Sequence, residues 1–136
     1  MASISTGLVQ LHSRYYGKGP TKAKTHLVDD TVICILRGGF TRAERTLIEQ
    51  GESDAVHHVR RSFQRVMEEQ FRDIVESATG RNVIAYMSQV HEGPELALEV
   101  FVLEPEQDGE QEHREPSLAE PDVPAIAPDV PAIEPD

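Results

Sequence analysis

The sequence predicts an α+β fold, in which helices pack on a four-stranded, mainly antiparallel sheet and the elements follow the order α-β-β-α-α-β-β. Three observations support this prediction. Apolar residues recur at helical spacing in separate segments. Four β-rich runs stand in two neighbouring pairs, each joined by a short turn-forming sequence. Single glycines follow the helical segments, where a helix end favours a left-handed residue.

The first helix is expected over residues 4–16. Apolar side chains share one face of it: Ile4, Leu8, Leu11 and Tyr15. Gly17 suits the position just past a helix end, and Pro20 prevents the helix from resuming. The Gly17-Lys18-Gly19 stretch looks like a phosphate-binding loop, but such a loop follows a strand and precedes a helix. Here the order is reversed, so we interpret these glycines as a helix end.

Two further helices are expected in the middle of the chain. Thr41 and Glu44 have the spacing of a capping box, and Gly51 ends a helix of about ten residues. Residues 54–79 form a longer helix that Gly80 ends. Its apolar stripe consists of Val56, Val59, Phe63, Met67, Phe71, Ile74 and Ala78. At ~1.5 Å per residue this helix would span ~39 Å, which is long for so small a domain, so part of it is expected to overhang, kink or contact a second subunit.

The strands are expected in two hairpins. Residues 22–28 and 31–37 form the first, with two aspartates as its turn, and residues 81–91 and 95–104 form the second. The second and fourth strands are apolar on both faces, and a sheet of this kind must be covered on both sides. Three helices could cover it, but the first helix is short, so we favour a homodimer.

The charge of the chain is concentrated in its last part. Residues 1–103 carry 12 basic and 13 acidic residues, whereas residues 104–136 carry 1 and 11. Seven of the nine prolines also fall in residues 105–136, which repeat the hexamer PDVPAI. We therefore expect a folded domain over residues 1–104 and a disordered, acidic, proline-rich tail over 105–136. The tail is either a solvated spacer or a docking segment, whose apolar anchors would be Val123, Ile126, Val130 and Ile133.

Three features favour the cytoplasm. The single cysteine, Cys34, lies in an apolar strand and cannot form an intramolecular disulfide. The first residues lack the pattern of a signal peptide. No stretch of the sequence approaches the ~20 apolar residues that a membrane-spanning helix needs, so no direct membrane insertion is expected.

The strongest candidates for an anion- or partner-binding site are basic residues of the loop after the first helix and of the third helix. They are Lys18, Arg60, Arg61 and Arg65. The alternative is an exposed helix face whose charged side chains form ion pairs with one another. Nucleic acid is not expected as a partner, because residues 1–103 have no net positive charge and the phenylalanines of the helix lie in its apolar stripe.

No catalytic or metal-binding set stands out. His57 and His58 are adjacent, whereas two metal ligands on one helix stand four residues apart. Ser13 and Ser88 have no evident base. We therefore expect a protein that is not an enzyme and holds no metal and no cofactor.

Residues 3–105 resemble the MpsC-like family of bacterial proteins. The segments that carry the resemblance are Tyr16-Gly17-Lys18-Gly19-Pro20, Asp29-Asp30, Gly39 with Thr41-Arg42-Ala43-Glu44, and Arg60-Arg61. The resemblance implies a cytoplasmic accessory of a membrane-potential-generating system, linked to cation or bicarbonate transport, and implies no catalytic residue. The function expected is therefore a non-enzymatic accessory or regulatory module that partners a membrane transport system. The alternative is a domain that senses a small anion or a nucleotide through its basic helix face.

Overall fold

The computed structural model describes residues 1–106 and confirms the predicted fold class and element order. The helices are α1 (Ala2–Tyr16), α2 (Arg42–Glu49) and α3 (Ser53–Thr79). The strands are β1 (Lys22–Val28), β2 (Thr31–Arg37), β3 (Val83–His91) and β4 (Leu96–Leu103). Nearly all of the predicted tail, residues 105–136, lies outside the described residues, so the prediction of its disorder stays a prediction.

All four strands form one antiparallel sheet in the order β1-β2-β4-β3. The two hairpins are the expected ones, and they join through β2 and β4, so that Cys34 pairs with Glu99. The two strands that are apolar on both faces are thus the two central strands.

The predicted helix ends are present. Thr41 and Glu44 form the capping box: the Glu44 amide donates to Thr41 Oγ1 at 3.1 Å, and the Thr41 amide donates to Glu44 Oε1 at 2.8 Å. Gly17 ends α1 in the left-handed conformation, with φ of 81°, and its amide donates to the Ser13 carbonyl. The glycines around Lys18 are therefore part of a helix end, as the sequence predicts.

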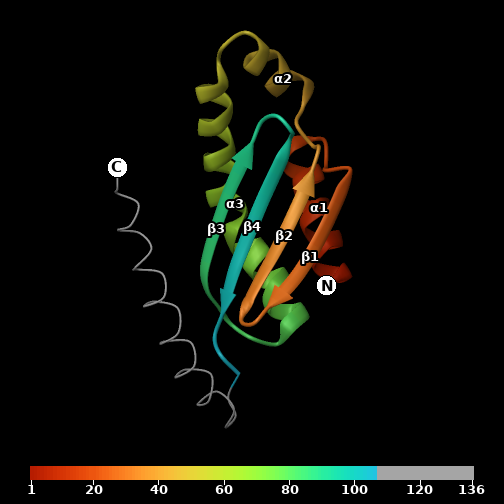
Figure 1. Ribbon diagram of the computed structural model, residues 1–136, viewed down its shortest axis with the longest axis vertical. Helices are drawn as coiled ribbons and strands as arrows, with labels where there is room; N and C mark the ends of the chain where they lie inside the picture. Colours follow the sequence, from red (N-terminus) through yellow and green to blue (C-terminus); the bar gives the residue numbers. More distant parts are fainter. Residues whose placement is uncertain (107–136) are drawn as a thin grey trace, which may run out of the picture. The chain divides into compact units, whose positions relative to one another are not determined.

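The core lies between the sheet and two helices. Figure 1 shows the sheet in front of α1 and α3, which both lie behind it. The largest fully buried apolar side chains are Phe40, Phe71, Phe101, Ile4, Leu8, Leu36, Met67, Leu103, Val32, Val56 and Val75. At ~1.5 Å per residue the 27 residues of α3 are ~40 Å long, against ~27 Å for the eight residues of β4. The short α2 packs against α3.

The other side of the sheet carries no helix within residues 1–106. The less favoured alternative, that three helices cover both faces, is therefore not realised within residues 1–106. No helix of residues 1–106 is long and apolar enough to span a membrane.

Candidate functional site: the open face of the sheet

We call the side of the sheet that faces away from α1 and α3 the open face. Because side chains alternate along a strand, every second residue belongs to it. Its residues are Lys22, Lys24, His26 and Val28 of β1, Thr31, Ile33, Ile35 and Arg37 of β2, Ala85, Met87, Gln89 and His91 of β3, and Leu96, Leu98, Val100 and Val102 of β4.

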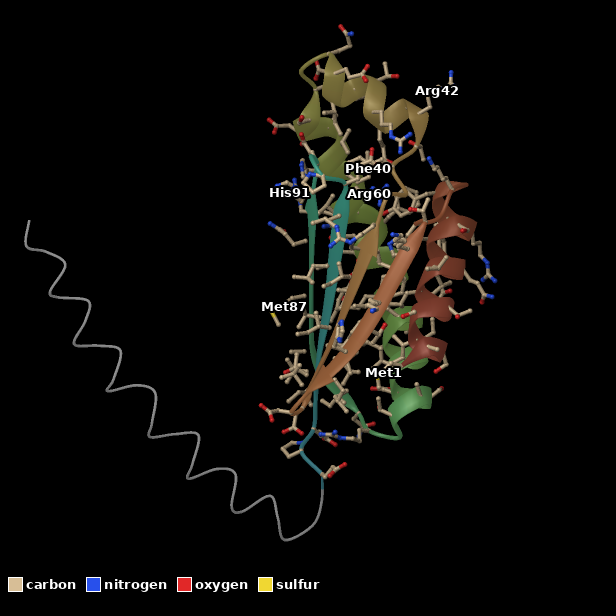
Figure 2. The ribbon with its side chains drawn as sticks, turned by 45° about the vertical axis from the view of Figure 1, so that its right-hand side comes forward. Met1, Phe40, Arg42, Arg60, Met87 and His91 are labelled. Atoms are coloured by element: carbon tan, nitrogen blue, oxygen red, sulfur yellow. The ribbon has the colours of Figure 1, made fainter. Side chains whose placement is uncertain are left out.

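The centre of the open face is apolar. Ile35 stands opposite Leu98, and Ile33 stands opposite Val100, on the two central strands. Leu98 is 39% exposed and Met87 is 54% exposed, and Figure 2 shows Met87 directed away from the helices. A contiguous exposed apolar patch is typical of a surface that binds another molecule.

The charged positions of the open face are all basic. They are Lys22, Lys24, His26, Arg37 and His91, and the face holds no aspartate or glutamate. Lys22 and Arg37 stand directly opposite each other on β1 and β2. Like charges in this position destabilise a sheet.

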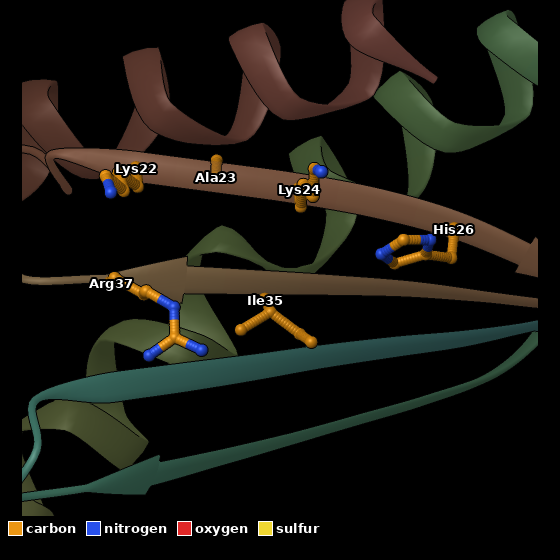
Figure 3. A pocket seen from close by; sticks show the side chains of 6 residues that line it. All are labelled: Lys22, Ala23, Lys24, His26, Ile35 and Arg37. Atoms are coloured by element: carbon orange, nitrogen blue, oxygen red, sulfur yellow. The ribbon is translucent and has the colours of Figure 1, made fainter.

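A hollow of about 480 Å³ lies beside these basic side chains (Figure 3). It is lined by Lys22, Ala23, Lys24, His26, Ile35 and Arg37. Figure 3 shows Lys22 and Arg37 at one end of the hollow, His26 at the other, and Ile35 between them. We call this concavity the cationic hollow.

Arg60, which the sequence analysis placed on a basic helix surface, is buried instead. It is 4% exposed, and it donates to Glu44 from Nε at 2.6 Å and from Nη2 at 2.7 Å. Its guanidinium lies over the rings of Tyr16 and Phe40, 4.0 and 4.8 Å from their centres, and Figure 2 labels Phe40 and Arg60 side by side. Burial alone would raise the pKa of Glu44, but the hydrogen bonds from Arg60 and Thr41 lower it below its ordinary value.

The other three predicted candidates, Lys18, Arg61 and Arg65, do not form a common surface with Arg60. Arg61 and Arg65 lie on the exposed side of α3, and Lys18 is half-buried in the loop after α1. Arg61 and His57 line a hollow of about 130 Å³, and His57 Nε2 lies 2.8 Å from the Glu92 carboxylate. The structure therefore does not gather the four basic residues on one surface, because Arg60 points into the protein.

A second polar feature crosses the inner side of the sheet. Thr25, Cys34, Glu99 and Ser88 are cross-strand neighbours and form one row over all four strands. Glu99 is 1% exposed and accepts a hydrogen bond from the Tyr86 hydroxyl at 2.6 Å.

The surroundings of Glu99 change its acidity. Burial raises the pKa of Glu99 to about 7, although the hydroxyl of Tyr86 partly opposes this. His12 Nε2 lies 4.0 Å from the Glu99 carboxylate, and burial lowers the pKa of His12. The sequence analysis missed this group. Its signal was an ionisable residue at an inward position of the apolar run LALEVFVL.

Within residues 1–106, no group of three or more His, Cys, Asp or Glu side chains is placed to hold a metal ion. The features of the described part are thus an uncovered apolar and cationic sheet face, a buried arginine–glutamate pair and a buried polar row.

Fold and surface together define a small α+β domain in which the helices of residues 1–106 all lie on one side of the sheet. The chain belongs to a known family, described as Na+-translocating membrane potential-generating system (MpsC), whose model matches residues 1–105. This match confirms the resemblance. Neither the curated proteins nor the solved structures contain a significant match to the chain.

Proposed function

We propose that this protein is a non-enzymatic, cytoplasmic accessory or regulatory module of a membrane-potential-generating system, and that it works as a dimer whose two copies meet through the open face. Family membership supports the link to such a system. The observation that carries the binding mode is the apolar centre of the open face, where Leu98 is exposed and Ile33 and Val100 are half-buried. Packing within the domain does not explain this apolar centre, because α1 and α3 lie on the other side of the sheet and do not contact these side chains.

We also propose that two copies associate through the apolar centre of this face. Four strands spaced ~4.8 Å apart, over eight residues of ~3.4 Å each, give a sheet of roughly 500 Å². Two such faces in complete contact would cover at most about 1,000 Å² in total, which is the size of a weak or transient interface. Because β1 is an edge strand, its basic side chains would lie at the rim of a contact centred on β2 and β4, where they stay open to solvent.

The molar mass in solution tests the homodimer. We expect twice the chain mass of 15.1 kDa for the wild type and the single mass for Leu98→Asp. Val66→Asp is a matched control, because Val66 is 58% exposed but lies on α3. A monomeric wild type, or a dimer that Leu98→Asp leaves intact, would contradict this part of the proposal.

Affinity capture from detergent-solubilised membranes of the source cells tests the accessory role. We expect the tagged wild type and Val66→Asp to retain an integral membrane component of a transport system, and Leu98→Asp, which should be monomeric, to lose it. If all three proteins retain the component equally, its binding does not need the dimer. If none retains it, the link to the membrane system fails for this chain.

The helix-face version of anion sensing has less support. It needs Arg60 on the surface, but the guanidinium of Arg60 is committed to Glu44 and stacked on Tyr16. Only Arg61 and Arg65 remain exposed on that helix face.

A further inference from the structure

We propose that the cationic hollow on β1 and β2 is a binding site for a phosphate group carried on an organic body. This inference is separate from the docking function. A protein that fails to bind phosphate could still associate through the apolar centre of the open face. A protein that fails to associate through that centre would still have the cationic hollow.

The first argument is an uncompensated cluster of charge. Lys22 and Arg37 are direct cross-strand neighbours, and Lys24 follows two residues along β1 on the same face. Within residues 1–106, none of these three side chains makes an ion pair or a hydrogen bond. Like charges opposite each other cost stability, so this arrangement lacks a structural reason. An anion held between them would remove the cost.

The contrast with the rest of the domain strengthens this argument. Other arginines have carboxylates as partners: Arg45 pairs with Glu95, Arg60 with Glu44, and Arg72 with Glu68. Several other cations of residues 1–106 also make no ion pair with a carboxylate, so what sets Lys22, Lys24 and Arg37 apart is that they lie together beside one concavity. Local conflicts of this kind are expected at functional sites.

The number and type of the cations favour phosphate over a single carboxylate. Two lysines and one arginine are positively charged at neutral pH, and His26 closes the other end of the hollow. A phosphate monoester carries close to two negative charges and three acceptor oxygens. The planar fork of Arg37 can donate two parallel hydrogen bonds to it, while the lysines act as point charges.

The size of the hollow indicates more than a free ion. Its volume of about 480 Å³ falls in the range of roughly 300–1,000 Å³ that is usual for organic ligands. Ile35 and the methylene stems of the two lysines supply apolar surface beside the charges. The expected ligand is thus a phosphate ester with an apolar or planar portion.

Two sources offer this chemistry, a soluble nucleotide or phosphorylated metabolite and the headgroup of an anionic phospholipid. Two measurements on the full-length protein distinguish them. The first is the melting temperature with and without adenosine triphosphate, at constant ionic strength. The second is flotation with vesicles of phosphatidylglycerol and phosphatidylcholine, compared with vesicles of phosphatidylcholine alone.

We expect binding in at least one of the two measurements. Binding of adenosine triphosphate would raise the melting temperature by a few degrees, and binding of a lipid headgroup would make the protein float with the anionic vesicles only. Binding should weaken as salt is added, because the side chains are exposed. Arg37→Gln and Lys22→Gln should each abolish it. Both variants should melt at or above the temperature of the ligand-free wild type, because each removes one of two opposed like charges.

Arg61→Gln is the matched control, since Arg61 is an exposed arginine of α3. It should bind as the wild type does. The proposal is overturned if neither measurement shows binding, if either Arg37→Gln or Lys22→Gln still binds as the wild type does, or if Arg61→Gln abolishes binding. The last result would instead assign the anion to the helix face.

Discussion

Arg60 of α3 donates two hydrogen bonds to Glu44 of α2, at 2.6 and 2.7 Å, and also donates to the carbonyl of Gly39 at 3.2 Å. Both charged side chains are almost fully buried. Glu44 in turn closes the capping box with Thr41. The pair therefore fixes the start of α2 against α3, and its tight geometry offsets the cost of removing two charges from water.

Removing one partner of this pair should be costly. We expect Arg60→Ala to lower the free energy of unfolding by about 3–5 kcal/mol, because it leaves the Glu44 carboxylate buried without a counter-charge. Urea denaturation measures this loss. Arg45→Ala is the control, since Arg45 pairs with Glu95 at the surface and its loss should change stability little. Equal effects of the two substitutions would contradict the structural role assigned to Arg60.

Glu99 should make the stability depend on pH. Its pKa is about 7 in the folded protein and near the ordinary 4.5 in the unfolded chain. Below pH 4.5 the carboxyl is protonated in both states, so it costs nothing. As the pH rises from 4.5 to 7 the unfolded state loses the proton first, and stability falls, by up to about 3 kcal/mol in total.

Glu99→Gln should remove this fall, because the amide can still accept the hydrogen bond from Tyr86 but does not ionise. The measurement is the difference in free energy of unfolding between the two proteins at several pH values. His12 acts in the opposite direction. Its lowered pKa gives stability that is present above about 6.5 and lost as the pH falls. Because His12 Nε2 lies 4.0 Å from the Glu99 carboxylate, the two groups are coupled, so both proteins are compared in a His12→Asn background. A difference that is flat from pH 4.5 to 7 would contradict the account of Glu99.

Gly39 should tolerate substitution less well than Gly51. Both have positive φ, 94° and 84°. An added Cβ at Gly39 would lie 3.2 Å from backbone atoms of Pro20, whereas at Gly51 it would meet open space. We expect Gly51→Ala to cost about 1–2 kcal/mol from backbone strain alone, and Gly39→Ala to cost more. Thermal unfolding compares the two, and a smaller loss at Gly39 would argue against the close contact.

The sequence predicts the parts of this fold that depend on local periodicity. The alternation of Val32, Cys34 and Leu36 with Ile33 and Ile35 gave the two faces of β2 correctly, because a strand has a period of two. The pairing of β2 with β4 joins residues that are 59 to 71 positions apart, and local pattern does not contain it.

In the candidate site, too, local sequence pattern predicts some features, whereas others depend on the tertiary fold. An arginine in a basic run is usually solvated, so Arg60 was predicted to be exposed, and only the fold reveals Glu44 and Tyr16 beside it. The cationic hollow was missed because Lys22 and Arg37 are fifteen residues apart and become neighbours only through the register of the hairpin. Apolar residues on both faces of the central strands did predict that each side of the sheet has an apolar centre.

The account depends most on one statement, that the open face is covered in the working protein. Cysteine labelling in native membrane fractions tests it most directly. Met87→Cys places a thiol on the open face, at a position 54% exposed, and Val66→Cys places one on α3, at a position 58% exposed. The native Cys34 is buried, and burial raises the pKa of its thiol, so background labelling should be low. We expect Met87→Cys to be labelled several-fold more slowly than Val66→Cys, whereas equal labelling of the two positions would contradict the account.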